Sequence, residues 1–243
     1  MDSGYYAVCA GLAAQTQALD VVAHNLSNLT TTGYRGEQTT FRSLVTGATA
    51  ASPTLNAVIN NFGLLNGSRL DLRSGSLAPT GNPLDVAVAG NGFLAVQSPQ
   101  GVLYTRDGSF HVTSAGQLVT SEGNAVLGEQ GAVILPSGNV TISSDGTISV
   151  DGNLVDKLQL AEFAPGTNLT ALGNATYAAP AGAALPVADS QVRQGMLEGS
   201  NVSATEGVVQ LIMAQRNTEM LGRALGAIDG QLNQIAVQDL PKV

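Results

Sequence analysis

The stretch "HNLSNLTTTGYRGEQ", residues 24–38, ends an amphipathic helix and starts the next part of the chain. The end of one helix does not require an Asn/Thr run of this length, and the run is followed by Gly-Tyr-Arg-Gly. Asn25 and Asn28 can hydrogen-bond backbone groups at the helix end. Gly33 can adopt a left-handed conformation, and Tyr34 can pack the chain as it leaves the helix. The stretch therefore predicts a shaped turn between a helix and a second structural unit.

A helix precedes this turn, over residues 1–30. Large apolar side chains recur every seven residues along it, which makes the narrow apolar seam typical of a helix that packs on another helix in a supercoil. The expected packing positions on this helix are Leu12, Leu19 and Leu26.

A second long helix is predicted over residues 203–243. It opens with the capping box Ser203-Ala204-Thr205-Glu206, and its apolar residues then recur at spacings of three and four. Two such seams predict a coiled coil that brings the ends of the sequence together and packs further apolar surface against neighbouring subunits. A glycine row at 222, 226 and 230 is either a smooth face for close helix approach or merely tolerated. The expected packing positions are Leu221, Leu225, Ile228 and Leu232.

The middle of the chain, residues 80–165, alternates short apolar-polar runs such as "GFLAVQ" with turn signals. These are Asn91-Gly92, Asp107-Gly108, Ala115-Gly116, Glu122-Gly123, Ser137-Gly138, Asp145-Gly146 and Asp151-Gly152. Such signals between alternating runs favour hairpins. We predict an antiparallel β-domain, open-barrel or sandwich-like, and hence an α+β fold. Residues 31–79 are expected to form an extended linker of an inner shell, and residues 166–202 a return segment. The β-domain core and turns are expected at Leu84, Asp85, Gly92, Phe93, Tyr104, Arg106, Asp107, Gly108 and Phe110.

Composition excludes several classes of function. The net charge of −8 should repel phosphate backbones, so nucleic-acid binding is not expected. No uninterrupted apolar run is long enough to insert in a membrane. The N-terminus has no basic start before its apolar stretch, so we expect export without a cleaved signal peptide. Cys9 is the single cysteine, and it reads as a small apolar residue of a helix face rather than as a reactive or intermolecular thiol.

The sequence shows no arrangement for catalysis, a metal or a cofactor. His24 and His111 lie far apart without a second ligand at metal-binding spacing. We read His24 as a helix-end residue and His111 as an outward residue of a strand. Acidic residues mostly precede glycine in turns, where a local hydrogen bond explains them. Arg106 is either paired with a neighbouring carboxylate or a solvated strand-end arginine. We predict that the protein is not an enzyme.

Three segments together resemble a known family. "VVAHNLSNLTTTGYRGEQTTF" (21–41) resembles the N-terminal signature of bacterial flagellar axial proteins. "GNPLDVAVAGNGFLAVQSPQGVLYTRDGSFHVTSAGQLVTSEGNAVLG" (81–128) resembles the core shared by rod and hook proteins, and "VRQGMLEGSNVSATEGVVQLIMAQRNTEM" (192–220) resembles the C-terminal signature. Within the family the chain looks most like the proximal rod protein of the flagellar basal body.

This resemblance implies a structural function. Members pair their terminal helices in an inner layer around an export channel and direct the β-domain outward. They leave the cell through the flagellar type III export apparatus and polymerise, with copies of themselves and other rod proteins, into the shaft that crosses the periplasm and transmits motor torque. The resemblance also implies one turn where the chain leaves the first helix and a matching turn where it enters the second. The residues of these turns are Asn25, Asn28, Gly33, Tyr34, Glu198, Ser200, Asn201 and Val202.

A competing hypothesis is a glycan-binding or peptidoglycan-cleaving β-protein on a coiled-coil stalk. It requires an exposed aromatic platform or two supporting carboxylates. The sequence has no Trp, and Tyr104 and Phe110 occur at a spacing that indicates core positions.

Overall fold

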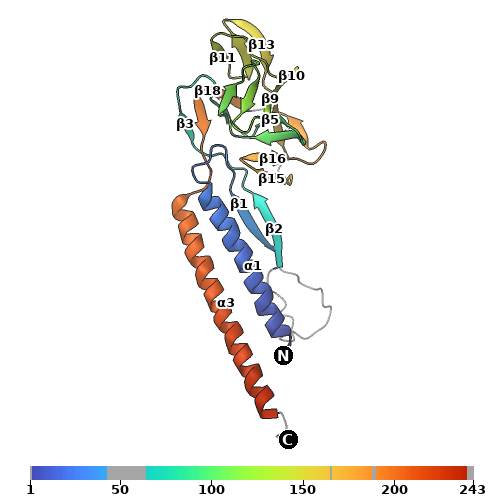
Figure 1. Cartoon of the computed structure of the whole chain (residues 1–243), viewed down its shortest axis with the longest axis vertical. Helices are drawn as coiled ribbons and strands as arrows, with labels where there is room; N and C mark the ends of the chain where they lie inside the picture. The colour runs from blue at the N-terminus through green and yellow to red at the C-terminus, as the bar shows by residue number, and fades with distance from the viewer. Residues whose placement is uncertain (1, 43–63, 165, 188–189, 240–243) are drawn as a thin grey trace. The chain divides into compact units, whose positions relative to one another are not determined.

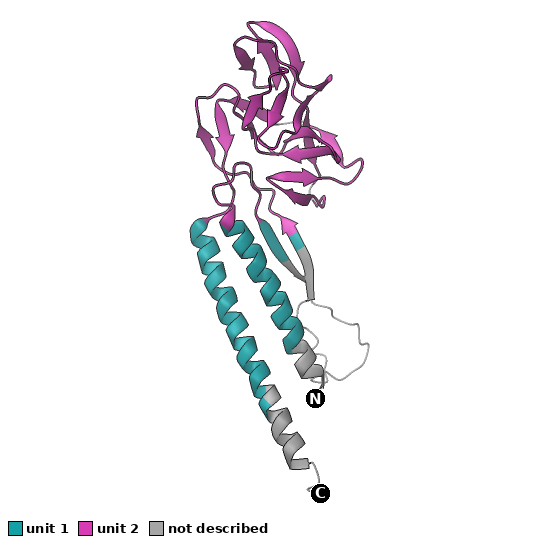
Figure 2. Ribbon diagram, in the orientation of Figure 1, with its two compact units in different colours: residues 1–26, 37–68, 204–243 teal, residues 27–36, 69–203 magenta. Residues whose placement is uncertain are grey.

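The computed structural model describes residues 2–42, 64–164, 166–187 and 190–239. The chain divides into two compact units, coloured separately in Figure 2. Unit 1 contains residues 1–26, 37–68 and 204–243, and unit 2 contains residues 27–36 and 69–203. The short stretch 27–36, which the sequence shows directly after the first helix, thus belongs to unit 2.

Unit 1 holds the two long helices, α1 (Asp2–Ser27) and α3 (Ala204–Asp239), seen in Figure 1. Helix α3 begins one residue after Ser203, which puts that side chain in the capping position that its sequence predicts. Strands β1 (Glu37–Arg42) and β2 (Leu64–Leu70) pair in a two-stranded sheet. Residues 43–63, which fall in the predicted linker, lie outside the described residues.

The buried side of each helix follows the predicted spacing. On α3, Gly207 and Ala214 are buried, and the positions between and beyond them on the same face are half-buried: Leu211, Thr218, Leu221 and Leu225. On α1, Leu12, Leu19 and Leu26 are half-buried. A Cβ atom on Gly207 would lie 3.5 Å from Cδ1 of Leu26, so the end of α1 meets the start of α3. The side chains of Ile228 and Leu232 lie outside those that the structure describes.

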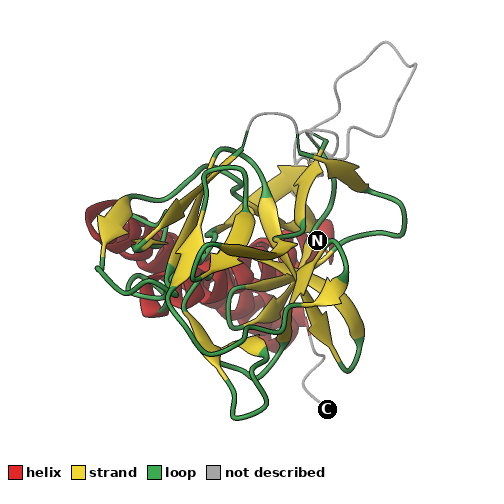
Figure 3. Cartoon of the chain, turned by 90° about the horizontal axis from the view of Figure 1, so that it is seen from above, coloured by secondary structure: helices red, strands yellow, loops and turns green. Residues whose placement is uncertain are grey.

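Unit 2 consists of antiparallel sheets, and its described residues contain no helix (Figure 3). The largest sheet has ten strands, with the central order β15-β16-β6-β5-β9-β8-β7 and with β10, β14 and β17 attached beside it. A three-stranded sheet, β11-β12-β13, and the pairs β18-β4 and β19-β3 complete the unit. Its strands are β3 (Leu77–Pro79), β4 (Val86–Ala89), β5 (Phe93–Ser98), β6 (Gly101–Thr105), β7 (Phe110–Val112), β8 (Leu118–Thr120), β9 (Ala125–Gly128), β10 (Gly131–Ala132), β11 (Val140–Ile142), β12 (Thr147–Val150), β13 (Asn153–Lys157), β14 (Leu160–Phe163), β15 (Thr170–Gly173), β16 (Thr176–Ala178), β17 (Ala184–Pro186), β18 (Gln191–Gln194) and β19 (Met196–Glu198). The α+β fold with a central antiparallel β-domain is confirmed.

Two apolar clusters form the core of unit 2. The larger one contains aliphatic residues and Phe110, with Leu84 packed at its border. The smaller one is aromatic: Phe93 meets Phe163 and Tyr177 edge-on, with ring centroids 5.4 and 5.9 Å apart. Tyr104 also packs on Phe163, so the aromatic side chains weighed for a sugar platform belong to the core.

The turn signals predict the hairpins only in part. The turns at 115–116, 122–123, 145–146 and 151–152 join strands that pair with each other. The hairpin prediction is wrong at 91–92, 107–108 and 137–138, because the strands beside each of these turns pair elsewhere: β4 pairs with β18, β7 with β8 and β10 with β9. A local turn signal fixes the bend but not the partner of the next strand.

Residues 166–202, where a return segment is predicted, carry five strands, β15 to β19. Strand β16 pairs with β6, β18 with β4 and β19 with β3. The chain therefore adds strands to the β-domain on its way back to the second helix.

Candidate functional site

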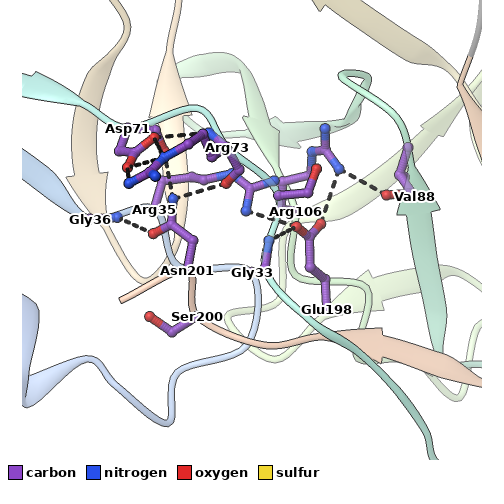
Figure 4. A network of polar contacts seen from close by, with 12 residues as sticks. Gly33, Arg35, Gly36, Asp71, Arg73, Val88, Arg106, Glu198, Ser200 and Asn201 are labelled. Carbon is purple, nitrogen blue, oxygen red and sulfur yellow. Dashed lines mark hydrogen bonds and ion pairs between the residues drawn. The ribbon is translucent and has the colours of Figure 1, made fainter. Parts of the chain in front are cut away.

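Four stretches of unit 2 meet at a buried polar cluster, which Figure 4 shows from close by. They are residues 31–36, 71–76, 105–108 and 198–201, and we call them together the joint. Stretch 31–36 follows α1 in the sequence, and stretch 198–201 precedes α3. The joint thus contains both passages of the chain that lead from the helices into the β-domain and back.

Gly33 lies where only glycine fits. Its φ of +67° is left-handed, as predicted, and favours glycine. A Cβ atom on Gly33 would lie 2.2 Å from the backbone nitrogen of Asp107 and 2.3 Å from the carbonyl carbon of Arg106. The amide of Gly33 also donates a 2.7 Å hydrogen bond to the carbonyl oxygen of Glu198. The outgoing chain therefore lies directly against two other stretches of the joint.

Glu198 is the centre of the cluster. Its side chain and those of Arg35 and Arg106 are fully buried, with 0% of their surface exposed. Nη1 of Arg35 lies 2.7 Å from Oε1 of Glu198, and Nη1 of Arg106 donates to Oε2 at 3.0 Å. The Arg35 contact is an ion pair without hydrogen-bond alignment, since no described group completes a hydrogen bond with Nη1 of Arg35. The amide of Gly75 donates to the same Oε1 at 2.7 Å, so one carboxylate joins three stretches of the chain.

Arg106 is held by several contacts, although its Nε has no hydrogen-bond partner among the described residues. Its guanidinium donates to the carbonyl oxygens of Val88 and Gly90, at 2.9 and 2.6 Å, and stacks 4.9 Å from the ring centre of Phe93. Of the two readings of its sequence, the paired one holds. Burial lowers the pKa of Arg106 to about 10; the charge of Glu198 opposes this shift and that of Arg35 adds to it. Arg106 is therefore cationic at neutral pH.

Asn201 joins the outgoing and returning chains by backbone contacts. Its Oδ1 accepts from the amide of Gly36 at 2.8 Å, and its Nδ2 donates to the carbonyl oxygens of Asp71 and Arg73 at 2.8 and 2.9 Å. Its own amide donates to the carbonyl oxygen of Tyr34 at 3.3 Å. One asparagine thus bonds backbone groups of two other stretches of the joint, 31–36 and 71–76.

The rim of the joint carries an exposed ion pair. Arg73, whose side chain is 78% exposed, bonds the carboxylate of Asp71 through two nitrogens. Burial acts to raise the pKa of Asp71, but the hydrogen bonds and charge of Arg73, with the charge of Arg35, hold it below the ordinary value. The rim pair is screened by solvent and contributes little to stability compared with the buried cluster.

The structure brings many predicted site residues together in the joint and leaves others apart. Gly33, Tyr34, Glu198, Ser200 and Asn201 lie in it, and so do Arg106, Asp107 and Gly108. Ser200 Oγ accepts from the amide of Val202. Asn28 bonds Thr31 within the turn, whereas Asn25 exchanges hydrogen bonds with both backbone groups of Glu37 in unit 1. The remaining predicted positions belong to the helices or to the β-domain core: Leu12, Leu19, Leu26, Leu221, Leu225, Leu84, Asp85, Gly92, Phe93, Tyr104 and Phe110.

The sequence analysis missed Arg35, Gly75 and Tyr177. The Tyr177 hydroxyl accepts from the amide of Arg35 at 2.9 Å, and Gly75 approaches the carbonyl of Gly199 too closely for any side chain. Arg35 stands in the quoted Gly-Tyr-Arg-Gly, and this is the only signal that could have singled it out.

Other kinds of site find no support in the described residues. They include no group of three or more His, Cys, Asp or Glu side chains placed to hold a metal ion. No helix in the described part of the chain is both long enough and apolar enough to span a membrane. His111 is exposed on β7, and Cys9 is half-buried in α1.

Comparison with known proteins identifies the family. Residues 9–35 match the flagella basal body rod protein family, residues 87–150 the D1 domain of the flagellar hook protein FlgE/F/G family, and residues 193–237 the C-terminal region of the flagellar basal body rod FlgEFG proteins.

Relatives match over nearly the whole chain. The flagellar basal-body rod protein FlgG of Borreliella burgdorferi is 31% identical over 93% of this chain and 95% of its own length. FlgF of Mesorhizobium japonicum is 34% identical over 90% of this chain and 89% of its own, and FlgF of Caulobacter vibrioides is 33% identical over the full length of both. The chain therefore belongs to the family of flagellar basal-body rod proteins and is a structural component of the rod.

Proposed function

We propose that this chain is the proximal-rod member, which polymerises with copies of itself and with other rod proteins into the helical drive shaft around the export channel. It leaves through the flagellar type III export apparatus without signal cleavage and takes its place where the rod crosses the periplasm. The motif "LEGSNV" at 197–202 supports the proximal assignment. In-frame deletion, followed by imaging of where the shaft stops, tests it: an intact proximal shaft in the deletion strain would contradict it.

In this proposal the ends of the chain, 1–30 and 203–243, form the inner layer as a coiled coil, and residues 80–165 form the outward β-domain. The half-buried leucine seam of α3 and its contact with α1 at Gly207 support the pairing. The helices are expected to gain most of their order on assembly, because a helix pair with exposed apolar side chains is marginal alone. Circular dichroism of the monomer against the assembled rod tests this, and fully formed helices in a dilute monomer would count against it.

The joint carries the load between the two layers. The observation that supports this role most is the buried carboxylate of Glu198, bonded to Arg35, Arg106 and Gly75 from three stretches of chain. The joint holds together the stretch that follows α1 and the stretch that precedes α3, so a torque carried along the chain from the helices enters the β-domain through it. Glu198→Gln should therefore give shafts that break or fail under load, and swimming of this variant in media of rising viscosity measures it; unchanged motility at all viscosities would contradict the role.

A further inference from the structure

Helix α3 has apolar side chains on two opposite faces. One face is the half-buried seam of Leu211, Thr218 and Leu225 described above. On the other side, Val209, Met213, Arg216 and Met220 follow one another at spacings of four, three and four, and we call these four the outer face of α3. Its apolar members are 45%, 60% and 60% exposed. Regular spacing of this kind is what a helix needs to pack on a second helix.

Helix α1 has an exposed face with the same period but mainly polar side chains. Ala13, Gln17, Asp20 and His24 are exposed and also lie at spacings of four, three and four; we call them the outer face of α1. Ala10 and Ala23 flank it and are exposed too. The two rows thus share one spacing, and the small alanines on and beside the α1 row leave room for the long side chains of α3.

The two outer faces also carry opposite charges. Arg216 stands in the middle of the outer face of α3, and Asp20 stands on that of α1. Both are exposed, and within the residues that the structure describes neither has an ion-pair partner. Their charges are complementary across a contact between two copies.

Asp20 and Arg216 lie at similar heights along their helices, measured from one shared point. Leu26 and Gly207 lie against each other and therefore at the same height along the two helices. Because the helices are antiparallel, the residues before Leu26 in α1 and the residues after Gly207 in α3 lie on the same side of this point. Asp20 is six residues from Leu26, about 9 Å, and Arg216 is nine residues from Gly207, about 14 Å. The difference is roughly one helical turn, so a laterally adjacent copy needs only a small axial step to bring Asp20 opposite Arg216. Met213 then lies opposite Ala23, and Met220 opposite Gln17.

We propose that the outer face of α3 packs on the outer face of α1 of the next copy of this chain, with Arg216 paired to Asp20. The proposal rests on the proposed function and deepens it by naming the two surfaces and the partner. Because the two surfaces differ, the contact is heterologous, and its repetition extends an assembly instead of closing a dimer.

Disulfide trapping in isolated basal bodies tests the contact. Cys9→Ala removes the single native thiol of this chain; Met213→Cys then adds a thiol to the outer face of α3, and Ala23→Cys adds one beside the outer face of α1. Mild oxidation is expected to give a ladder of linked chains, and each single-cysteine variant is expected to give none. Dimers from Met213→Cys alone would show that α3 meets α3, and shafts without any ladder would show that the face is covered otherwise; either result overturns the contact while leaving the rod function standing.

Exchanging the charges at positions 20 and 216 tests the contact a second time, without any cysteine. Asp20→Arg and Arg216→Asp should each raise the protein concentration needed for polymerisation about tenfold, because each places like charges opposite one another. The double variant should recover most of this loss. No recovery in the double variant, with both single variants folded by circular dichroism, would overturn the pairing even if the cysteine variants fail to assemble. Chains that never polymerise, wild type included, would contradict the proposed function itself.

Discussion

The joint and the helices differ in how far their side chains are buried within one chain. In the joint, Arg35, Arg106 and Glu198 are fully buried and bonded within one molecule. On α3, Met213 and Met220 are both 60% exposed. The joint is therefore complete in a single chain, whereas the helices present surface that another chain must cover. This difference predicts that changes in the joint act on the monomer and changes on the outer helix face act on assembly.

The largest expected effect is that of Glu198→Gln. Removing the carboxylate leaves two buried guanidinium groups uncompensated, and we expect the free energy of unfolding of the monomer to fall by about 3–5 kcal/mol in urea titrations. Glu129→Gln is the matched control, since Glu129 is 64% exposed and meets Lys157 only at 3.7 Å, so a loss below about 1 kcal/mol is expected. Equal losses of unfolding free energy in the two variants would contradict this account, because the joint would then stabilise the monomer no more than an ordinary surface ion pair.

Gly33→Ala is expected to cost somewhat less, about 2–3 kcal/mol, because the new methyl group meets the Arg106–Asp107 peptide in addition to the strained φ. Gly123→Ala separates these two causes. Gly123 has a φ of +81° with no atom within 4 Å of a Cβ, so only the conformational cost of about 1 kcal/mol remains. Thermal unfolding of the two variants measures the difference, and a Gly33 variant no worse than the Gly123 one would mean that the close approach does not exist.

A smaller effect concerns Asp107 in the joint. Burial raises the pKa of its carboxyl group; hydrogen bonds from Ser109 oppose this, and the charges of Asp85 and Glu122 add to it. A folded pKa above the unfolded one means that the folded state binds the proton more tightly, so this group favours folding increasingly as the pH falls through its folded pKa. Relative to Asp107→Asn, the wild type should therefore gain stability as the pH falls through the raised folded pKa of Asp107 towards the unfolded value of about 4. A constant difference over that range would show that Asp107 titrates as in the unfolded chain.

The smallest effect on the monomer is expected for Met220→Glu. An exposed substitution should change the free energy of unfolding by less than about 0.5 kcal/mol, yet it should stop assembly by placing a charge on the outer face of α3. Gln215→Glu adds the same charge elsewhere on the exposed surface of this helix and should assemble. Pelleting assays with both variants decide the matter: if Met220→Glu pellets like Gln215→Glu, the exposed methionines are not assembly surface.

The sequence predicted the elements better than their partners. Heptad spacing was enough for α1, a capping box and spacings of three and four were enough for α3, and alternation was enough for strands such as β5 and β7. All of these patterns are local. Pairing was not local: Asp107-Gly108 read as a hairpin turn, but Gly108 is required because a Cβ there would lie 1.7 Å from the carbonyl oxygen of Val86. The glycine is needed because two segments that are distant in the sequence approach each other closely there. The neighbouring residues in the sequence give no sign of this contact.

The joint was predicted in parts for the same reason. Gly33, Glu198, Asn201 and Arg106 were each singled out, but nothing in the sequence placed Glu198 against Arg106, ninety residues earlier. Arg35 had no local sign of burial, since an arginine beside a turn usually lies in solvent. The joint also places residues 27–36 in unit 2, so a change at Gly33 acts on the β-domain as well as on the passage from the helix.

Hydrogen exchange of the monomer tests most directly whether the joint is complete in one chain and the helices are not. The amides of Gly33 and Gly75, which donate to Glu198, should exchange as slowly as those of β5 in the core. Amides of α3 should exchange much faster, and Glu198→Gln should speed exchange at both glycines without altering α3. Joint amides that exchange as fast as those of α3 in the wild-type monomer would contradict the account.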